Sequence, residues 1–262
     1  MRVEHRGEGD PELAVVGGIH GDEPCGVRAV ERLLAADHEF RRPVTFVVAN
    51  EAAVERGVRY VDADLNRSFP GDPEGDALED RLAAELSDVL AGCTVLSMHS
   101  TQSHAEPFAI VDGFTDFARD LVPRLDVVAA VDSGRFVDGR LFAADADADV
   151  VEVECGLQGS AAAVENATDA VRDFLVATGA LDGTAVPHEV PAYRLTRRLP
   201  KAAAAEYEVF VENFQPVGAG QTYAAADGEA LAAESDFYPV LVSPYGYDDV
   251  FGYAAERVGT LP

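Results

Sequence analysis

The sequence predicts an α/β protein, with a mainly parallel or mixed sheet, helices on both faces and a small C-terminal β subdomain. Two observations carry this prediction. The front half alternates strand-like apolar runs with helical segments, an order that gives a mainly parallel sheet covered on both sides. After Gly183 the chain changes to prolines, aromatics and short alternating runs, which are typical of antiparallel strands. We expect a main domain over residues 1–184 and a β-rich subdomain over residues 185–262.

The elements follow from local patterns. The apolar run 12–18 ends in two glycines, as a buried strand does, and apolar residues at helical spacing then predict a helix over 23–36. Asp22 is the expected cap of that helix and Pro24 suits its first turn. The next expected elements are a strand over 43–49, a helix over 76–91 and a strand over 94–99.

The middle and the end of the chain give weaker patterns. Residues 150–155 alternate, so Glu152 and Glu154 share one face of a strand and either could point into a site. Glu154 is preferred because it stands at the strand's end, just before Gly156. Other expected elements are strands over 108–111, 192–199, 207–211 and 221–225, helices over 117–125 and 160–178, and a strand or helix end over 127–131; residues 201–209 could also begin as a helix.

Composition narrows the classes of partner. The net charge of -27 makes nucleic acid and anionic membrane surfaces poor partners. No stretch approaches the ~20 apolar residues of a membrane span, and the first residues lack a signal-peptide core, so we expect a cytoplasmic location. Lys201 is the only lysine against 19 arginines, which indicates adaptation to a salt-rich, halophilic setting. Oligomeric state is left open.

A histidine, a nearby glutamate and a distant histidine form a candidate metal site. His20 and Glu23 lie at the predicted strand-to-helix turn, in the run GGIHGDE, and His99 ends the strand-like run 94–99. Zinc in hydrolases is commonly held by two imidazoles and one carboxylate, with a fourth position open to water. Both segments would emerge at carboxyl ends of strands, where open α/β sheets bind ligands. Without a metal, they would be a turn histidine, a core histidine and a helix-start carboxylate.

The segment 57–71 has a different chemistry. It reads GVRYVDADLNRSFPG and concentrates two arginines and an asparagine before a turn. Arginine offers a planar fork that grips carboxylates, and an asparagine beside it adds a directional donor. The segment therefore predicts binding of an anionic substrate.

Together these motifs resemble the succinylglutamate desuccinylase and aspartoacylase family, a branch of the zinc carboxypeptidase-like hydrolases. In the family's order and spacing they are GGIHGDEP (17–24), GVRYVDADLNRSFPG (57–71), SMHST (97–101) and VECGLQGS (153–160). The resemblance grows faint beyond roughly residue 160. One departure is Glu51, which follows Asn50 where relatives usually have proline, so we expect that turn to differ.

The resemblance implies a metal centre in a zinc carboxypeptidase-like fold. One zinc ion per chain would be held by His20, Glu23 and His99. Glu154 would be the general base and acid. Asp64 would orient a ligand imidazole, as a neighbour of zinc-bound histidines usually does.

The resemblance also implies an activity, the cleavage of the amide bond of an N-acyl amino acid or similar small acylated amine. Asn66 and Arg67 would hold the substrate carboxylate, and Arg59 would polarise the scissile carbonyl. The C-terminal subdomain would cover the site. The alternatives are a zinc carboxypeptidase acting on peptides and a non-catalytic zinc-binding protein. Tyr245 and Tyr247 are left outside the core site.

Overall fold

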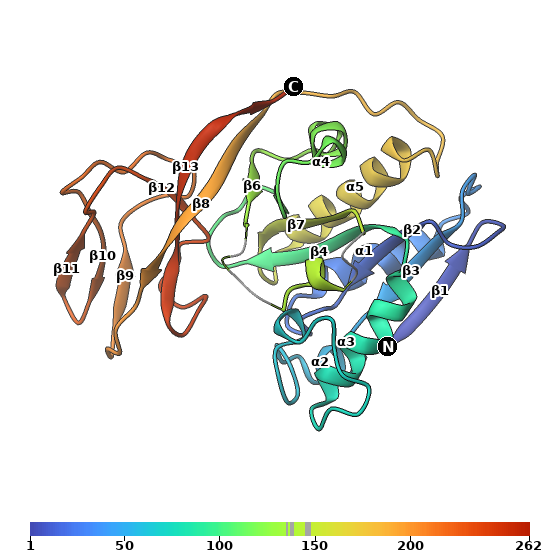
Figure 1. Ribbon diagram of the computed structural model, residues 1–262, viewed down its shortest axis with the longest axis horizontal. Helices are drawn as coiled ribbons and strands as arrows, with labels where there is room; N and C mark the ends of the chain where they lie inside the picture. The colour runs from blue at the N-terminus through green and yellow to red at the C-terminus, as the bar shows by residue number, and fades with distance from the viewer. Residues whose placement is uncertain (135, 137–138, 145–147) are drawn as a thin grey trace.

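The structure is a computed structural model that describes residues 1–134, 136, 139–144 and 148–262. A ten-stranded mixed sheet forms its centre (Figure 1). Its inner strands β3, β2, β4 and β7 run parallel, and β1, β5, β13 and β12 each pair antiparallel to a neighbour. The strand order is β1 (Arg2–Arg6), β3 (Val44–Val48), β2 (Leu13–Gly17), β4 (Thr94–Thr101), β7 (Val150–Leu157), β5 (Phe108–Val111), β6 (Ala130–Asp132), β8 (Val190–Pro200), β13 (Val250–Leu261) and β12 (Tyr238–Val240).

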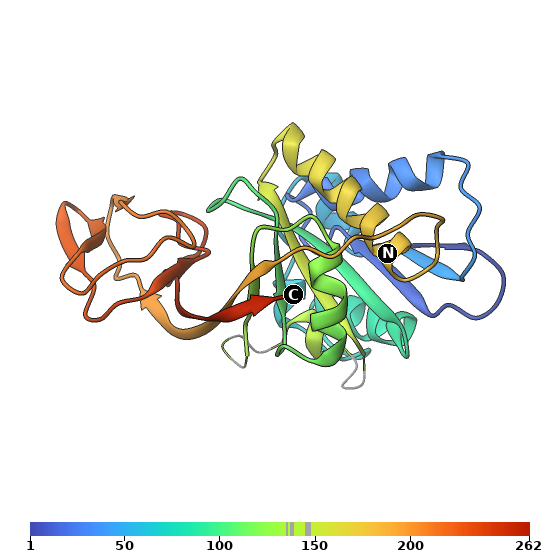
Figure 2. The same cartoon turned by 90° about the horizontal axis from the view of Figure 1, so that it is seen from above.

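Helices cover both faces of this sheet (Figure 2). On one face, α1 (Pro24–Ala35) and α5 (Ala161–Ala177) pack together over side chains such as Val15. On the other, α3 (Leu78–Leu90) packs over the alternate residues, such as Val16, because successive strand side chains point to opposite faces. The shorter helices are α2 (Glu51–Arg56), η1 (Leu65–Arg67), α4 (Asp116–Leu121), η2 (Val122–Arg124) and η3 (Leu141–Ala143).

The C-terminal part contributes to two sheets. A small antiparallel sheet of β9 (Tyr207–Val209), β10 (Thr222–Ala226) and β11 (Glu229–Ala232) lies at the end of the molecule opposite α1 (Figure 1). The long strands β8 and β13, however, belong to the central sheet, since Tyr193 of β8 pairs with Val131 of β6. The division into domains 1–184 and 185–262 stays a prediction.

The predicted fold class is confirmed, with corrections in detail. Glu23, not Asp22, occupies the N-cap position of α1, and no side chain caps that helix, because the Glu23 carboxylate is turned toward two histidines. The helix expected over 117–125 is divided into α4 and η2, residues 127–131 lead into the strand β6, and no helix forms over 201–209. The turn after Asn50 is the start of α2. Among the described residues, no helix is long and apolar enough to cross a membrane.

Candidate metal centre and substrate pocket

Glycines allow the chain between β2 and α1 to pass close to its neighbours. A Cβ atom on Gly17 would lie 2.5 Å from the carbonyl carbon of Gly26, and one on Gly21 would lie 2.1 Å from that of Ala53. Any larger residue would push α1 or α2 away from the turn. The tight packing buries the two polar side chains of the turn, so that His20 and Glu23 are each only 4 % exposed.

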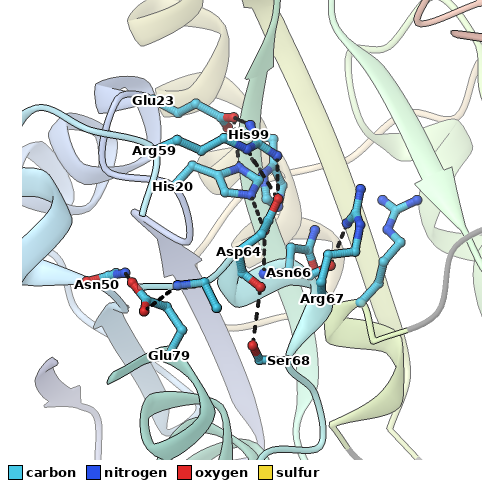
Figure 3. A network of polar contacts seen from close by, with 12 residues as sticks. His20, Glu23, Asn50, Arg59, Asp64, Asn66, Arg67, Ser68, Glu79 and His99 are labelled. Atoms are coloured by element: carbon cyan, nitrogen blue, oxygen red, sulfur yellow. Dashed lines mark hydrogen bonds and ion pairs between the residues drawn. The ribbon is translucent and has the colours of Figure 1, made fainter. Parts of the chain in front are cut away.

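Glu23 lies between two imidazoles (Figure 3). Its Oε1 lies 2.8 Å from Nδ1 of His20, and its Oε2 lies 3.2 Å from Nδ1 of His99. One ligand atom from each residue falls within 4.8 Å of the other two. Tetrahedral zinc, with bonds of 2.0–2.2 Å, holds ligand atoms about 3.4 Å apart. The donor set and its spacing therefore fit a zinc ion with small adjustments.

The outer nitrogens of both imidazoles are held by other side chains. Nε2 of His20 lies 3.0 Å from Oδ1 of Asp64, and Nε2 of His99 lies 3.3 Å from the Ser97 hydroxyl. This leaves the Nδ1 atoms facing Glu23, the arrangement in which zinc-binding histidines are oriented from behind. Burial lowers the pKa of His20, but the Glu23 and Asp64 carboxylates outweigh it and raise this pKa to about 9. A bound metal would displace that proton.

Residues of the segment 57–71 also contact the cluster of His20, Glu23 and His99. Oδ1 of Asp64 accepts a hydrogen bond from the backbone N–H of Asn66 at 2.9 Å and so caps η1. Arg59 donates to Oδ2 of Asp64 at 3.2 and 3.1 Å and to Oε1 of Glu23 at 3.3 Å. The predicted role of Asp64, orienting an imidazole, is compatible with this position, and Arg59 contacts both Asp64 and Glu23.

The buried carboxylate of Glu79 holds the segment 57–71 in place through hydrogen bonds to its backbone. Glu79 of α3 is 0 % exposed and accepts backbone hydrogen bonds from Val61 at 2.7 Å, Asp62 at 3.0 Å and Ala63 at 3.1 Å. Asn50, which also caps α2, donates a fourth at 2.9 Å. Burial acts to raise the pKa of Glu79, but these donors outweigh it and lower the pKa. Figure 3 shows Glu79 and Asn50 well away from the histidines.

One pocket brings the predicted residues together. All of them except Asp64, which lies behind His20, line this pocket. Glu154 of β7 pairs in register with His99 of β4. Its Oε2 is shielded from solvent and has no hydrogen-bond partner among the described residues, and burial raises the pKa of its carboxyl. Such a carboxyl is suited to accept a proton and to return it.

The two residues expected to hold a substrate carboxylate differ in availability. The Asn66 amide is already used within the fold: Oδ1 accepts a 2.8 Å bond from the Leu141 backbone, and Nδ2 donates to Glu152 at 3.3 Å. Arg67 is exposed and donates to the backbone oxygen of Asn66. Arg67 is thus the more available cation for a ligand.

Arg140 and Tyr247, which were not in the predicted core site, also line the pocket. Arg140 forms an ion pair with Glu152, a glutamate that is 1 % exposed. Residue 140 lies in a stretch without clear periodicity, so no signal marked it. Tyr247 also lines the pocket, and burial raises the pKa of its phenol while Arg140 and Arg67 act in the opposite direction. Tyr245, 59 % exposed, lies outside the pocket lining.

Comparison with known proteins gives a family match. The family described as "Succinylglutamate desuccinylase/Aspartoacylase catalytic domain" matches residues 9–167, more than half of the chain. An N-acyl-aromatic-L-amino acid amidohydrolase (carboxylate-forming) from Xenopus laevis is 40% identical over 84 residues, which are 29% of this chain and 28% of that protein. An N-alpha-acetyl-L-2,4-diaminobutyric acid deacetylase from Halomonas elongata is 38% identical over 112 residues, 38% of this chain and 31% of that one.

A solved structure extends the likeness beyond the matched region. The succinylglutamate desuccinylase/aspartoacylase from Rhodobacter sphaeroides aligns with a TM-score of 0.80 at 18% identity and covers 97% of this chain and 88% of its own. At that identity the likeness concerns the fold alone. The two curated relatives are matched over less than a third of their lengths.

Proposed function

The chain belongs to the succinylglutamate desuccinylase/aspartoacylase family, and we propose that it is a zinc-dependent amidohydrolase. Its substrate would be an N-acyl amino acid or a similar small acylated amine, cleaved to a carboxylate and a free amine. One observation carries this proposal: His20, Glu23 and His99 converge beside the buried, unpaired carboxylate oxygen of Glu154 in one pocket. The curated relatives are themselves amidohydrolases or deacylases of acylated amino acids.

The chain's own residues divide the work of amide hydrolysis. Zinc, when bound, would polarise a carbonyl and lower the pKa of a water. Arg67 would anchor the substrate carboxylate, which fixes the amide in the pocket. Arg59 would donate to the scissile carbonyl oxygen as its negative charge develops. Glu154 would accept a proton from the attacking water and pass it to the leaving nitrogen.

The two alternatives are each less well supported. A metal store or sensor has no need of Glu154, whose Oε2 is shielded from solvent and has no hydrogen-bond partner among the described residues. A carboxypeptidase has to admit a peptide, whereas residues of the C-terminal segment, such as Leu195, Val240 and Tyr253, line the pocket. We infer that residues 185–262 cover the site and restrict it to small substrates.

The proposal is tested by zinc content and hydrolysis measured together. Wild-type protein supplied with zinc at high salt should hydrolyse members of a panel of N-acetyl, N-succinyl and N-formyl amino acids. His20→Ala and His99→Ala should lose both the metal and hydrolysis. His5→Ala, which removes an exposed histidine of β1, is the matched control and should retain both. A zinc-loaded protein that cleaves no member of the panel would instead favour a binding role.

A further inference from the structure

We propose that the substrate is an N-acyl amino acid with a single carboxylate and an apolar side chain. This inference rests on the proposed function and assigns a substrate class to its pocket. Two features of the pocket support it, the balance of charged side chains and an apolar wall formed by neighbouring strands. A third observation, the position of Arg67, decides which half of the substrate is apolar.

Of the three arginines in the described pocket lining, two are already paired with carboxylates of the protein. Arg59 donates two hydrogen bonds to Asp64 and is assigned to the scissile carbonyl. Arg140 is paired with the buried Glu152. Arg67, the third arginine of the pocket, forms no ion pair with a carboxylate among the described residues. One free cation matches one substrate carboxylate, whereas a second carboxylate would be desolvated without a partner.

One wall of the pocket is apolar. It is lined by five side chains that are each at most 7% exposed. They belong to one hydrophobic cluster on one face of the central sheet. A substrate's apolar side chain covered by this wall would gain free energy in proportion to the area removed from water, and a carboxylate would gain nothing. The five are Ile110 of β5, Val131 of β6, Leu195 of β8, Val240 of β12 and Leu241 directly after β12.

A series of contacts connects Arg67 to the apolar wall. The turn that carries Arg67 is tied to η3, because Asn66 accepts a 2.8 Å hydrogen bond from the Leu141 backbone. The next residue of η3, Phe142, packs against the apolar cluster, and so does Tyr247, which lines the pocket with Arg67. The substrate carboxylate and the apolar group therefore belong to the same half of the molecule. In an N-acyl amino acid, that half is the amino acid.

Specificity constants for substrates with one common acyl group test the proposal. N-acetyl-leucine and N-acetyl-phenylalanine should exceed N-acetyl-aspartate and N-acetyl-glutamate in kcat/KM by about tenfold or more. N-acetyl-leucinamide, which lacks the carboxylate, should lose about as much. Preference for either dicarboxylate would overturn the inference and leave the proposed function intact. Failure to cleave any of them by a zinc-loaded protein would contradict the proposed function itself.

Variants of the apolar wall provide a second test. Its readout is a ratio of two specificity constants, which does not depend on how much of the variant protein is folded. For Leu195→Ala we compare kcat/KM for N-acetyl-leucine with kcat/KM for N-acetyl-glycine. The ratio of the first to the second should fall by about tenfold, since only the side chain of the leucine substrate is long enough to reach the wall. The ratio is taken within one preparation, so partial unfolding cancels. Leu157→Ala, a half-exposed leucine at the end of β7 outside the pocket lining, should leave it unchanged. An unaltered ratio in Leu195→Ala would overturn the assignment.

Discussion

Replacing Glu79 by glutamine should loosen the segment that carries Arg59, Asp64 and Arg67. The wild-type carboxylate is fully buried, and each of its oxygens accepts two hydrogen bonds. Glutamine has nearly the same shape but only one acceptor oxygen. Its NH2 group would face two donors, so two of the four bonds are lost and two buried donors stay unpaired.

The structure sets the size and the sign of the effect. A hydrogen bond to a charged group contributes about 1.5–3 kcal/mol, so two lost bonds cost about 3–6 kcal/mol of unfolding free energy at neutral pH. The donors hold the pKa of Glu79 below its ordinary value in the folded chain. Its contribution is therefore present above the ordinary pKa and is lost as pH falls through the folded pKa. The difference between wild type and Glu79→Gln should shrink in acid.

Urea denaturation in high potassium chloride, at pH 7 and in steps to well below the ordinary glutamate pKa of about 4.3, measures this difference. Glu85→Gln is the matched control, because Glu85 is exposed on the same helix and its change should stay within about 0.5 kcal/mol. A loss below about 1 kcal/mol for Glu79→Gln at pH 7, or a loss that does not shrink in acid, would refute this reasoning.

Three further predictions concern the pocket, the metal and the salt. Arg67→Ala should raise KM about 10–100-fold for substrates with a free carboxylate and leave neutral analogues nearly unchanged, and an equal rise for both would contradict its anchoring role. Asp64→Asn should weaken zinc binding about 10–100-fold in competition with a chelator, and an unaltered affinity would mean that Asp64 does not support His20. The net charge of -27 should make the melting temperature rise with potassium chloride, and undiminished stability at low salt would rule out halophilic adaptation.

The front of the fold and the convergence of His20, Glu23 and His99 could be predicted because their signals are local. The strand β2, the glycines after it and the helix α1 lie within one short stretch, so His20 and Glu23 could be placed on a turn before any contact was known. His99 stands toward the end of a strand that pairs in parallel with β2. Parallel strands bring their carboxyl ends to one edge, and this sufficed to bring the three residues together.

The rest of the site depends on contacts between distant segments. Asn66 bonds to Glu152 and to the Leu141 backbone, and neither segment carries a pattern that shows this. Strand β13 contains glycines and charged residues, which obscure the alternation expected of a strand, and its pairing with β8 exists only in three dimensions. Asp22 was expected to cap α1 because sequence cannot show that Glu23 takes the N-cap position.

Glu154→Gln tests the central claim most directly, because it alters the proposed proton carrier and leaves the proposed metal ligands His20, Glu23 and His99 in place. Zinc content and hydrolysis of the best N-acyl amino acid should be measured on the same preparations of wild type and variant. We predict that the variant holds as much zinc as wild type and loses nearly all turnover. A variant that remains fully active would contradict the role of Glu154 and with it the proposed mechanism.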